Sequence, residues 1–159
     1  MKIDMKWLDD NGACSESKQE WTDKKMKPVE GVTLIKKLMK ADKFQWANWL
    51  IVRLMTHEQK IQYAIFAAEQ VIEIYEKKYP DDKRPRNAIK AAKEYIKAPT
   101  EKNKNAADAA YAAAHATHAA YAAADAAHAA ARTEMQNRII ENGIGILKQT
   151  GNREESNEN

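Results

Sequence analysis

The sequence contains few of the residues that shape tight turns and disulfide frameworks. Its 159 residues include five glycines, four prolines and two phenylalanines, and Cys14 is the single cysteine. A lone cysteine excludes a disulfide within the chain. The β-branched residues are scattered and do not alternate with polar residues as they do in strands. Because a chain of this length can build a core without disulfides or metals, the sequence predicts an all-α protein.

Long apolar segments are also missing. The first eight residues, Met1–Leu8, lack the continuous apolar stretch of a secretory signal. The longest weakly apolar tract is rich in alanine, and Asp108, His115 and Asp125 are among the polar residues that interrupt it. We therefore expect a cytoplasmic protein without a membrane span.

Charge and short motifs exclude several further classes. The formal net charge is +3, from 26 basic and 23 acidic residues, which is too small to indicate a nucleic-acid partner. The sequence has no Gly-x-Ser-x-Gly element, phosphate-binding glycine loop or dinucleotide fingerprint, and Cys14 has no histidine near it in sequence. These observations predict a protein that is not an enzyme and that needs no cofactor.

Apolar residues recur at helical spacing in four segments before the alanine-rich tract. The predicted helices cover about residues 28–40, 44–54, 57–79 and 86–97. Thr56 and Gln59 have the spacing of a capping box, which predicts a helix start near His57. The polar run Asp9–Gly12 predicts a turn between two short segments.

No linker is long enough to divide the chain, so we expect a single all-α domain over residues 1–150. Residues 151–159 contain no apolar side chain and are expected to form a disordered tail. The expected architecture is an antiparallel helical bundle, or a short helical stack, with a central alanine-rich helix.

The alanine-rich segment runs from Ala106 to Ala131, where 18 of 26 residues are alanine and the intrinsic helix propensity is high. One half of this helix is nearly all alanine, which predicts close packing against a neighbouring helix. The other half carries candidate binding residues, and these are Tyr111, His115, His118, Tyr121, Asp125, His128 and Arg132.

Several interpretations of this polar half stay open. His115 with His118, and Asp125 with His128, are one-turn pairs that could each bind a cation. The two pairs lie roughly 15 Å apart along the helix and no cysteine joins them, so we predict no metal site. The remaining interpretations are a hydrogen-bonded, partly buried face, which we favour, and a surface for a ligand or partner.

The second candidate site is the polar connection before residue 86. Asp82, Arg84 and Arg86 are candidate binding residues there, because guanidinium groups suit carboxylates and phosphates. The structural alternative, which we favour, is that an aspartate caps the next helix or pairs with Arg84 while Pro85 sets the first turn. Trp46 and Trp49 are likewise either a binding hot spot or, as we favour, part of the core.

Four stretches together resemble a known family. They are Trp49–Arg53, Glu69–Glu76, Tyr79–Ile89 and the alanine tract that carries tyrosine and histidine. Over roughly residues 40 to 135 the chain resembles the immunity proteins of bacterial polymorphic toxin systems, specifically the fifth-immunity-protein-like family, whose relatives also occur in phages and other mobile elements. The Asp-x-Arg-Pro-Arg-x-Ala-Ile pattern of Asp82–Ile89 is the most specific element of this resemblance.

The resemblance implies an all-α protein that binds and neutralises a toxin or another effector protein, as an immunity protein or as a phage-encoded inhibitor of a bacterial defence system. It also implies that Arg84, Arg86 and the tyrosine and histidine face are candidate contacts, with target specificity placed in residues 1 to 45. The alternative function is a helical module that sequesters a small phosphorylated ligand such as a nucleotide. Self-association into a homo-oligomer is compatible with either function.

Overall fold

The computed structural model describes residues 1–100 and 129–155 of the chain. Within these residues the protein has seven helices and one small two-stranded sheet, which confirms the all-α prediction. The chain divides into two compact units, Met1–Met55 and Thr56–Asn159, and each is described by itself. The single domain over residues 1–150 stays a prediction. Most of the predicted alanine-rich helix lies outside the described residues.

The first unit contains α1 (Met5–Asp10), α2 (Ser15–Asp23), α3 (Gly31–Lys40) and α4 (Phe44–Leu54). The turn predicted after α1 is confirmed, because Gly12 has a φ of 68° and donates its N–H to the Asp9 carbonyl at 3.1 Å. Glycine suits this left-handed conformation since it has no Cβ. The break predicted between α3 and α4 is also present, and Asp42 takes a φ of 55° there.

Helices α3 and α4 pack against each other. Their buried aliphatic residues are Leu34, Ile35, Ala47, Leu50 and Ile51. Gly31 begins α3, and a Cβ atom at this position would lie 2.8 Å from Cδ1 of Leu54 at the end of α4. A larger residue at this position would therefore require the Leu54 side chain to shift.

The small sheet pairs β1 (Lys2–Ile3) with β2 (Val29–Glu30) in antiparallel register, with Lys2 opposite Glu30 and Ile3 opposite Val29. Two residues are too few to show strand alternation, so the sequence contains no signal for this pair. Because residues 29 and 30 form β2, α3 begins at Gly31 and not at Pro28 as predicted. Glu30 caps α3, and its carboxylate accepts a hydrogen bond from the Thr33 N–H at 2.8 Å.

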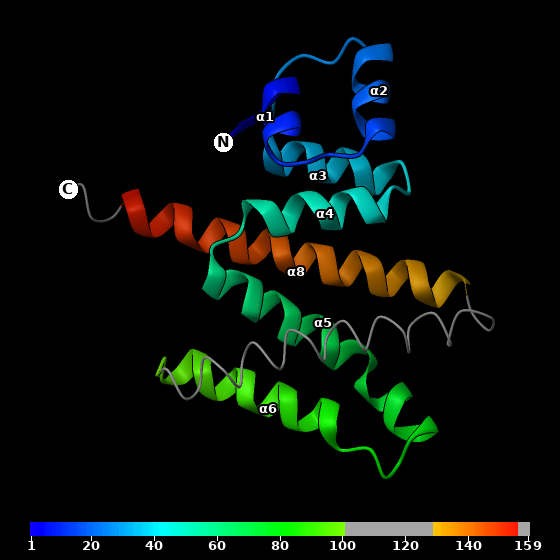
Figure 1. Cartoon of the computed structure of the whole chain (residues 1–159), viewed down its shortest axis with the longest axis vertical. Helices are drawn as coiled ribbons and strands as arrows, with labels where there is room; N and C mark the ends of the chain where they lie inside the picture. Colours follow the sequence, from blue (N-terminus) through cyan, green and yellow to red (C-terminus); the bar gives the residue numbers. More distant parts are fainter. Residues whose placement is uncertain (101–128, 156–159) are drawn as a thin grey trace. The chain divides into compact units, whose positions relative to one another are not determined.

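The second unit contains α5 (His57–Lys78), α6 (Arg84–Lys97) and α8 (Ala129–Glu155). Figure 1 shows α5 between α6 and α8, and α5 packs against both. The predicted capping box is confirmed, because the Thr56 hydroxyl accepts from the Gln59 N–H and the Gln59 side chain accepts from the Thr56 N–H. The same Gln59 side chain is buried and donates to the Ile146 carbonyl of α8 at 3.1 Å.

Helix α8 continues through two glycines, a residue type with low helix propensity. Gly143 and Gly145 both lie within it, and the helix ends at Glu155, past the predicted start of the tail at Gly151. Ile140, Ile144 and Ile146 are buried, and α8 packs on α5. Tertiary packing of this kind commonly outweighs the cost of about 1 kcal/mol that an interior glycine adds.

Candidate functional site

The candidate site lies where α5 ends and α6 begins. Helix α5 stops at Lys78, and the Tyr79 N–H donates to the Tyr75 carbonyl at 2.8 Å before Pro80 prevents further helix. Pro85 then occupies the first turn of α6 and is buried, in a position that suits proline because its missing N–H needs no helical partner. Local sequence therefore determines both ends of this connection.

Asp82 organises the connection through its two carboxylate oxygens. Its Oδ1 accepts from the backbone N–H of Arg84 at 3.0 Å and from Nε of Arg84 at 2.9 Å, and its Oδ2 accepts from Nη2 of Arg84 at 2.7 Å. The Tyr75 hydroxyl of α5 donates to the same Oδ2 at 2.7 Å. Asp82 thus ties the first residue of α6 to the last turns of α5.

These contacts shift the pKa values of Asp82, Tyr75 and Arg84. The Arg84 guanidinium, followed by the Tyr75 hydroxyl, holds the pKa of Asp82 well below its usual range. The hydrogen bond to Asp82 raises the pKa of Tyr75 and of Arg84. Asp82 is therefore ionised throughout the neutral pH range, where it stays paired with Arg84.

Two tyrosine rings and a lysine lie next to this hydrogen-bond network. The Tyr75 and Tyr79 rings lie 5.0 Å apart between centroids, and Nζ of Lys78 lies 5.5 Å from the centre of the Tyr79 ring. Tyr79 is 45 % exposed, and Ile74, one residue before Tyr75, is 46 % exposed. We call the residues Ile74, Tyr75, Lys78, Tyr79, Asp82 and Arg84 the α5–α6 corner.

Two further ion pairs join α5 and α6. Arg86 makes a bidentate contact with Glu76, in which Nε donates to Oε1 at 2.8 Å and Nη2 donates to Oε2. Lys93 pairs with Glu69. Both partners advance by seven residues in opposite directions, so the two helices are antiparallel and remain in register for two turns. Arg86 lowers the pKa of Glu76.

The predicted binding residues fall into separate places. Asp82 and Arg84 lie together in the corner, whereas Arg86 is paired with Glu76 of α5. The two arginines therefore use different carboxylates and do not share one anion. Arg132 lies in α8 and is half-buried. The other predicted binding residues, Tyr111, His115, His118, Tyr121, Asp125 and His128, lie outside the described residues.

The predicted site residues did not include Ile74, Tyr75, Tyr79 or Glu76. Tyr75 has helical spacing with Ile72 and Val71, which is typical of an apolar core face. The available signal was the pair Tyr79-Pro80, an aromatic residue in a connection that cannot be helical. The partner of Arg86 carries no local signal, because Glu76 is ten residues away in sequence.

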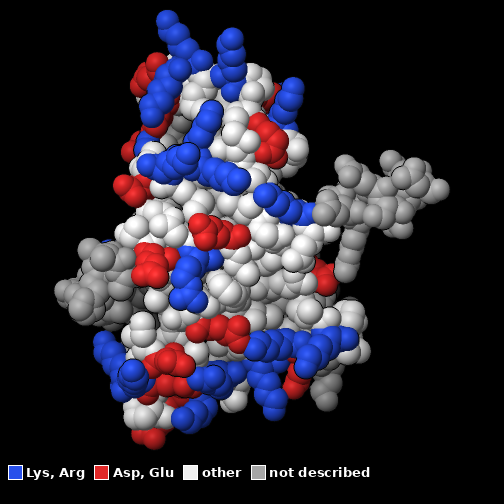
Figure 2. Space-filling view, turned by 180° about the vertical axis from the view of Figure 1, so that it is seen from behind, with Lys and Arg blue, Asp and Glu red and all other residues white. Residues whose placement is uncertain are grey.

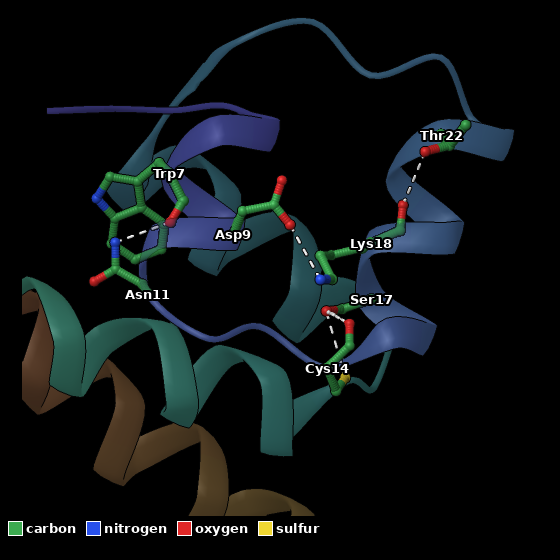
Figure 3. A network of polar contacts seen from close by, with 7 residues as sticks. All are labelled: Trp7, Asp9, Asn11, Cys14, Ser17, Lys18 and Thr22. Atoms are coloured by element: carbon green, nitrogen blue, oxygen red, sulfur yellow. Dashed lines mark hydrogen bonds and ion pairs between the residues drawn. The ribbon is translucent and has the colours of Figure 1, made fainter.

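The first unit contains a separate polar network around α1 and α2, shown in Figure 3. Lys18 donates to Asp9 at 3.0 Å, and the Asn11 side chain donates to the Trp7 carbonyl at 2.9 Å. Cys14 precedes α2, and its thiol lies 3.4 Å from the Ser17 hydroxyl. Interaction with Ser17 lowers the pKa of the exposed Cys14 thiol.

The two tryptophans considered as a hot spot are half-buried in α4. Trp49 packs edge-on against Trp7 with ring centroids 6.0 Å apart, and the Arg53 guanidinium lies 4.0 Å from the Trp49 ring centre. Arg53 also donates to the Asn11 carbonyl at 2.9 Å. Trp46 is covered by Lys43, whose Nζ lies 4.1 Å from the ring centre. Both rings therefore have partners inside the first unit.

No group of three or more histidine, cysteine, aspartate or glutamate side chains within the described residues is arranged to bind a metal ion. In the same part of the chain, none of the helices has the length and apolar character needed to cross a membrane.

The fold and the corner define a small helical protein with an ion-paired helix hairpin. The sequence model of the family described as Imm-5 like putative immunity protein matches residues 50–142. The match covers more than half of the chain and includes all of α5 and α6, so the chain belongs to this family. It confirms the resemblance carried by Asp82–Ile89. Neither curated proteins nor solved structures provide a further match.

Proposed function

We propose that this chain neutralises a toxin or effector protein in the cytoplasm by binding it in a stoichiometric complex, without catalysis. The observation that carries the proposal is membership of an immunity protein family over residues 50–142. Inhibition by binding requires a complementary surface, which in most complexes is largely ordered before binding, and it does not require a catalytic constellation.

The second unit supplies a surface of this kind. The Asp82–Arg84 pair, the Tyr75 hydroxyl and the Glu76–Arg86 pair all hold the connection between α5 and α6 in one conformation. Interfaces that are ordered before binding lose less conformational entropy on association. These contacts support a role of the hairpin as a rigid recognition element.

The test is co-expression of the full chain with the toxin domain encoded beside its gene. The expected result is restored growth of the host and an equimolar complex in size-exclusion chromatography with light scattering. A toxin that remains active, and elutes separately, in the presence of an excess of folded chain would contradict the proposal.

The alternative function, sequestration of a phosphorylated ligand, has weaker support from the described residues. The two arginines expected to bind a phosphate are each paired with a different carboxylate, Asp82 and Glu76. A nucleotide panel in a thermal-shift assay tests this alternative. A ligand present at 100 times its dissociation constant adds about 2.7 kcal/mol of stability and raises the melting temperature measurably.

A further inference from the structure

The α5–α6 corner contains large apolar side chains that are exposed to solvent. Among the described residues the large apolar side chains that remain exposed are Met1, Ile74 and Tyr79, and two of these three belong to the corner. Arg84, which binds Asp82 in the same corner, has a side chain that is 88 % exposed. Tyrosine and arginine are the residue types most often found, with tryptophan, at the energetic centre of protein interfaces.

Arg84 is exposed but already ordered. Its two side-chain bonds to Asp82 use two of the five N–H donors of a guanidinium group. Because the side chain is largely exposed, further N–H donors of the guanidinium remain accessible from solvent. A second carboxylate can therefore bind Arg84 without the entropic cost of ordering a free arginine side chain.

The charge of the surrounding surface favours an acidic partner. Between Glu73 and Lys90, the stretch that contains the corner, the chain carries six basic and four acidic side chains. Two of the four acidic side chains, Asp82 and Glu76, are paired with Arg84 and Arg86. Lys77 and Lys78 are exposed at the end of α5, Lys83 is exposed just before α6, and Lys90 is exposed on α6. An opposing acidic surface would gain attraction from these lysines and accelerate association.

The distribution of charge favours a protein over a nucleic acid. A phosphate backbone is bound by a continuous row of unpaired cations. On this hairpin Arg86 and Lys93 are paired with Glu76 and Glu69 of α5. Figure 2 shows acidic and basic side chains interspersed over the part of the surface that α5 and α6 form. Exposed Ile74 and Tyr79 add apolar area that only a partner with apolar contacts can cover.

We propose that the α5–α6 corner is the docking surface for a protein partner that presents a carboxylate to Arg84 beside an apolar recess for Tyr79 and Ile74. The inference rests on the proposed function and specifies the surface and the chemistry of its partner. The extra charge of the lysines controls the rate of association, while Tyr79 and Arg84 control the lifetime of the complex.

The first experiment measures binding of the full chain to the neighbouring toxin domain by surface plasmon resonance. Arg84→Gln removes one exposed positive charge from the corner, and Lys97→Gln removes one from the opposite end of α6 as the matched control. We expect Arg84→Gln and Tyr79→Ala each to weaken binding at least about tenfold, mainly through faster dissociation, and Lys97→Gln to stay within about twofold. Circular dichroism melting verifies that each variant is folded, and Tyr79→Ala leaves the Asp82–Arg84 pair intact.

Unchanged affinity of both corner variants, with tight wild-type binding, would overturn the corner as docking surface while leaving the proposed function in place. If the wild-type chain binds no toxin, the proposed function fails, and the second experiment decides the inference. It titrates the chain with a ten-residue glutamate peptide and with ten-nucleotide poly-dT, and follows backbone amide shifts by NMR. Peptide-induced shifts centred on residues 74–86 and lost in Arg84→Gln support the proposal. Shifts spread over all lysines, or stronger binding of poly-dT, contradict it.

Discussion

Helices α3 and α4 in the first unit and helices α5 and α6 in the second are both consecutive pairs with a short connection, but different forces join them. Ile35 and Ile51 are completely buried in the first pair and Leu50 is 2 % exposed. Between α5 and α6, Ile61 and Ala92 are the buried residues of the apolar cluster, and Ile65, Ala88, Tyr95 and Ile96 around them are only partly buried. At the edges of this cluster Glu69 and Glu76 of α5 form ion pairs with Lys93 and Arg86 of α6. In the connection between the helices, Asp82 pairs with Arg84.

This difference indicates which of the two helix pairs is better suited to binding a partner. Apolar burial contributes about 25 cal/mol per Å² and does not depend on ionisation, so the α3–α4 pair has a stable, closed interface. The α5–α6 pair has a thinner apolar interface, and surface ion pairs add little stability to it. Those ion pairs instead determine which side chains are oriented at the surface, and Arg84 is the clearest case.

The largest expected effect breaks the α3–α4 interface. Ile51→Ala removes a completely buried side chain and leaves a cavity, so the free energy of unfolding should fall by about 2 to 5 kcal/mol. Urea unfolding followed by tryptophan fluorescence measures the change. Gln45→Ala on the exposed face of α4 is the control and should change stability by no more than about 0.5 kcal/mol.

The same variant tests the proposed single domain. If residues 1–150 unfold as one cooperative unit, Ile51→Ala should lower the hydrogen-exchange protection of amides in α5 by the same free energy as in α4. Protection that falls in α3 and α4 alone would show two independently stable units and would contradict the single domain.

A somewhat smaller effect is expected from overfilling the thin interface of the second pair. Ala92 is 3 % exposed on α6, so Ala92→Leu adds three carbon atoms where neighbours from α5 already lie. We expect a loss of about 1 to 3 kcal/mol in urea unfolding. Asn87→Leu places the same side chain on the exposed face of α6 as a control. If Ala92→Leu instead stabilised the protein, the interface between α5 and α6 would have room for the larger side chain, which would contradict this prediction.

The next effect concerns the local signal that begins α5. Thr56→Ala removes the hydroxyl that accepts from the Gln59 N–H, and it should cost about 1 kcal/mol of stability. Thr56→Ser keeps this acceptor and should recover most of the loss, as measured by thermal unfolding of the three proteins. Equal melting of the alanine and serine variants would show that the capping hydrogen bond contributes nothing.

The smallest expected effect tests the ion pairs between α5 and α6. Because Arg86 depresses the pKa of Glu76, the pair stabilises the folded state above the unfolded glutamate pKa of about 4.3 and loses this effect as the pH falls through the depressed folded pKa. Arg86→Gln should lower the melting temperature by about 1 to 2 °C at pH 7, and the gap to wild type should close toward pH 3. Lys97→Gln is the control without this pair. A gap that stays constant over this pH range would contradict the linkage.

Local patterns predicted the helices well for identifiable reasons. Helix α4 begins at Phe44 and ends at Leu54 as expected, because apolar residues lie on nearly every side of that segment. The Thr56–Gln59 capping box is a signal of four residues and needs no tertiary partner. The pairing of Asp82 with Arg84 was one of the expected structural alternatives, since the two residues are only two apart.

The candidate site was predicted only in part. Arg84 was selected with Arg86 as a joint anion site, but the structure separates their roles because Glu76 binds Arg86 from the neighbouring helix. Tyr79 and Ile74 were not selected, because exposure depends on which neighbours cover a side chain. Sequence spacing does not contain that information.

By itself the sequence determined the helical class, most helix ends, the polar connection before α6 and, through Asp82–Ile89, the family. These features depend on propensity, capping and short-range spacing, which act between residues close in the chain. Only the tertiary structure decided the β1–β2 pairing, the passage of α8 through Gly143 and Gly145, and the binding of Glu69 and Glu76 to α6. It also decided that Arg84 and Tyr79 are exposed together. Each of these depends on packing between residues far apart in sequence, whose energies exceed local preferences once the chain has folded.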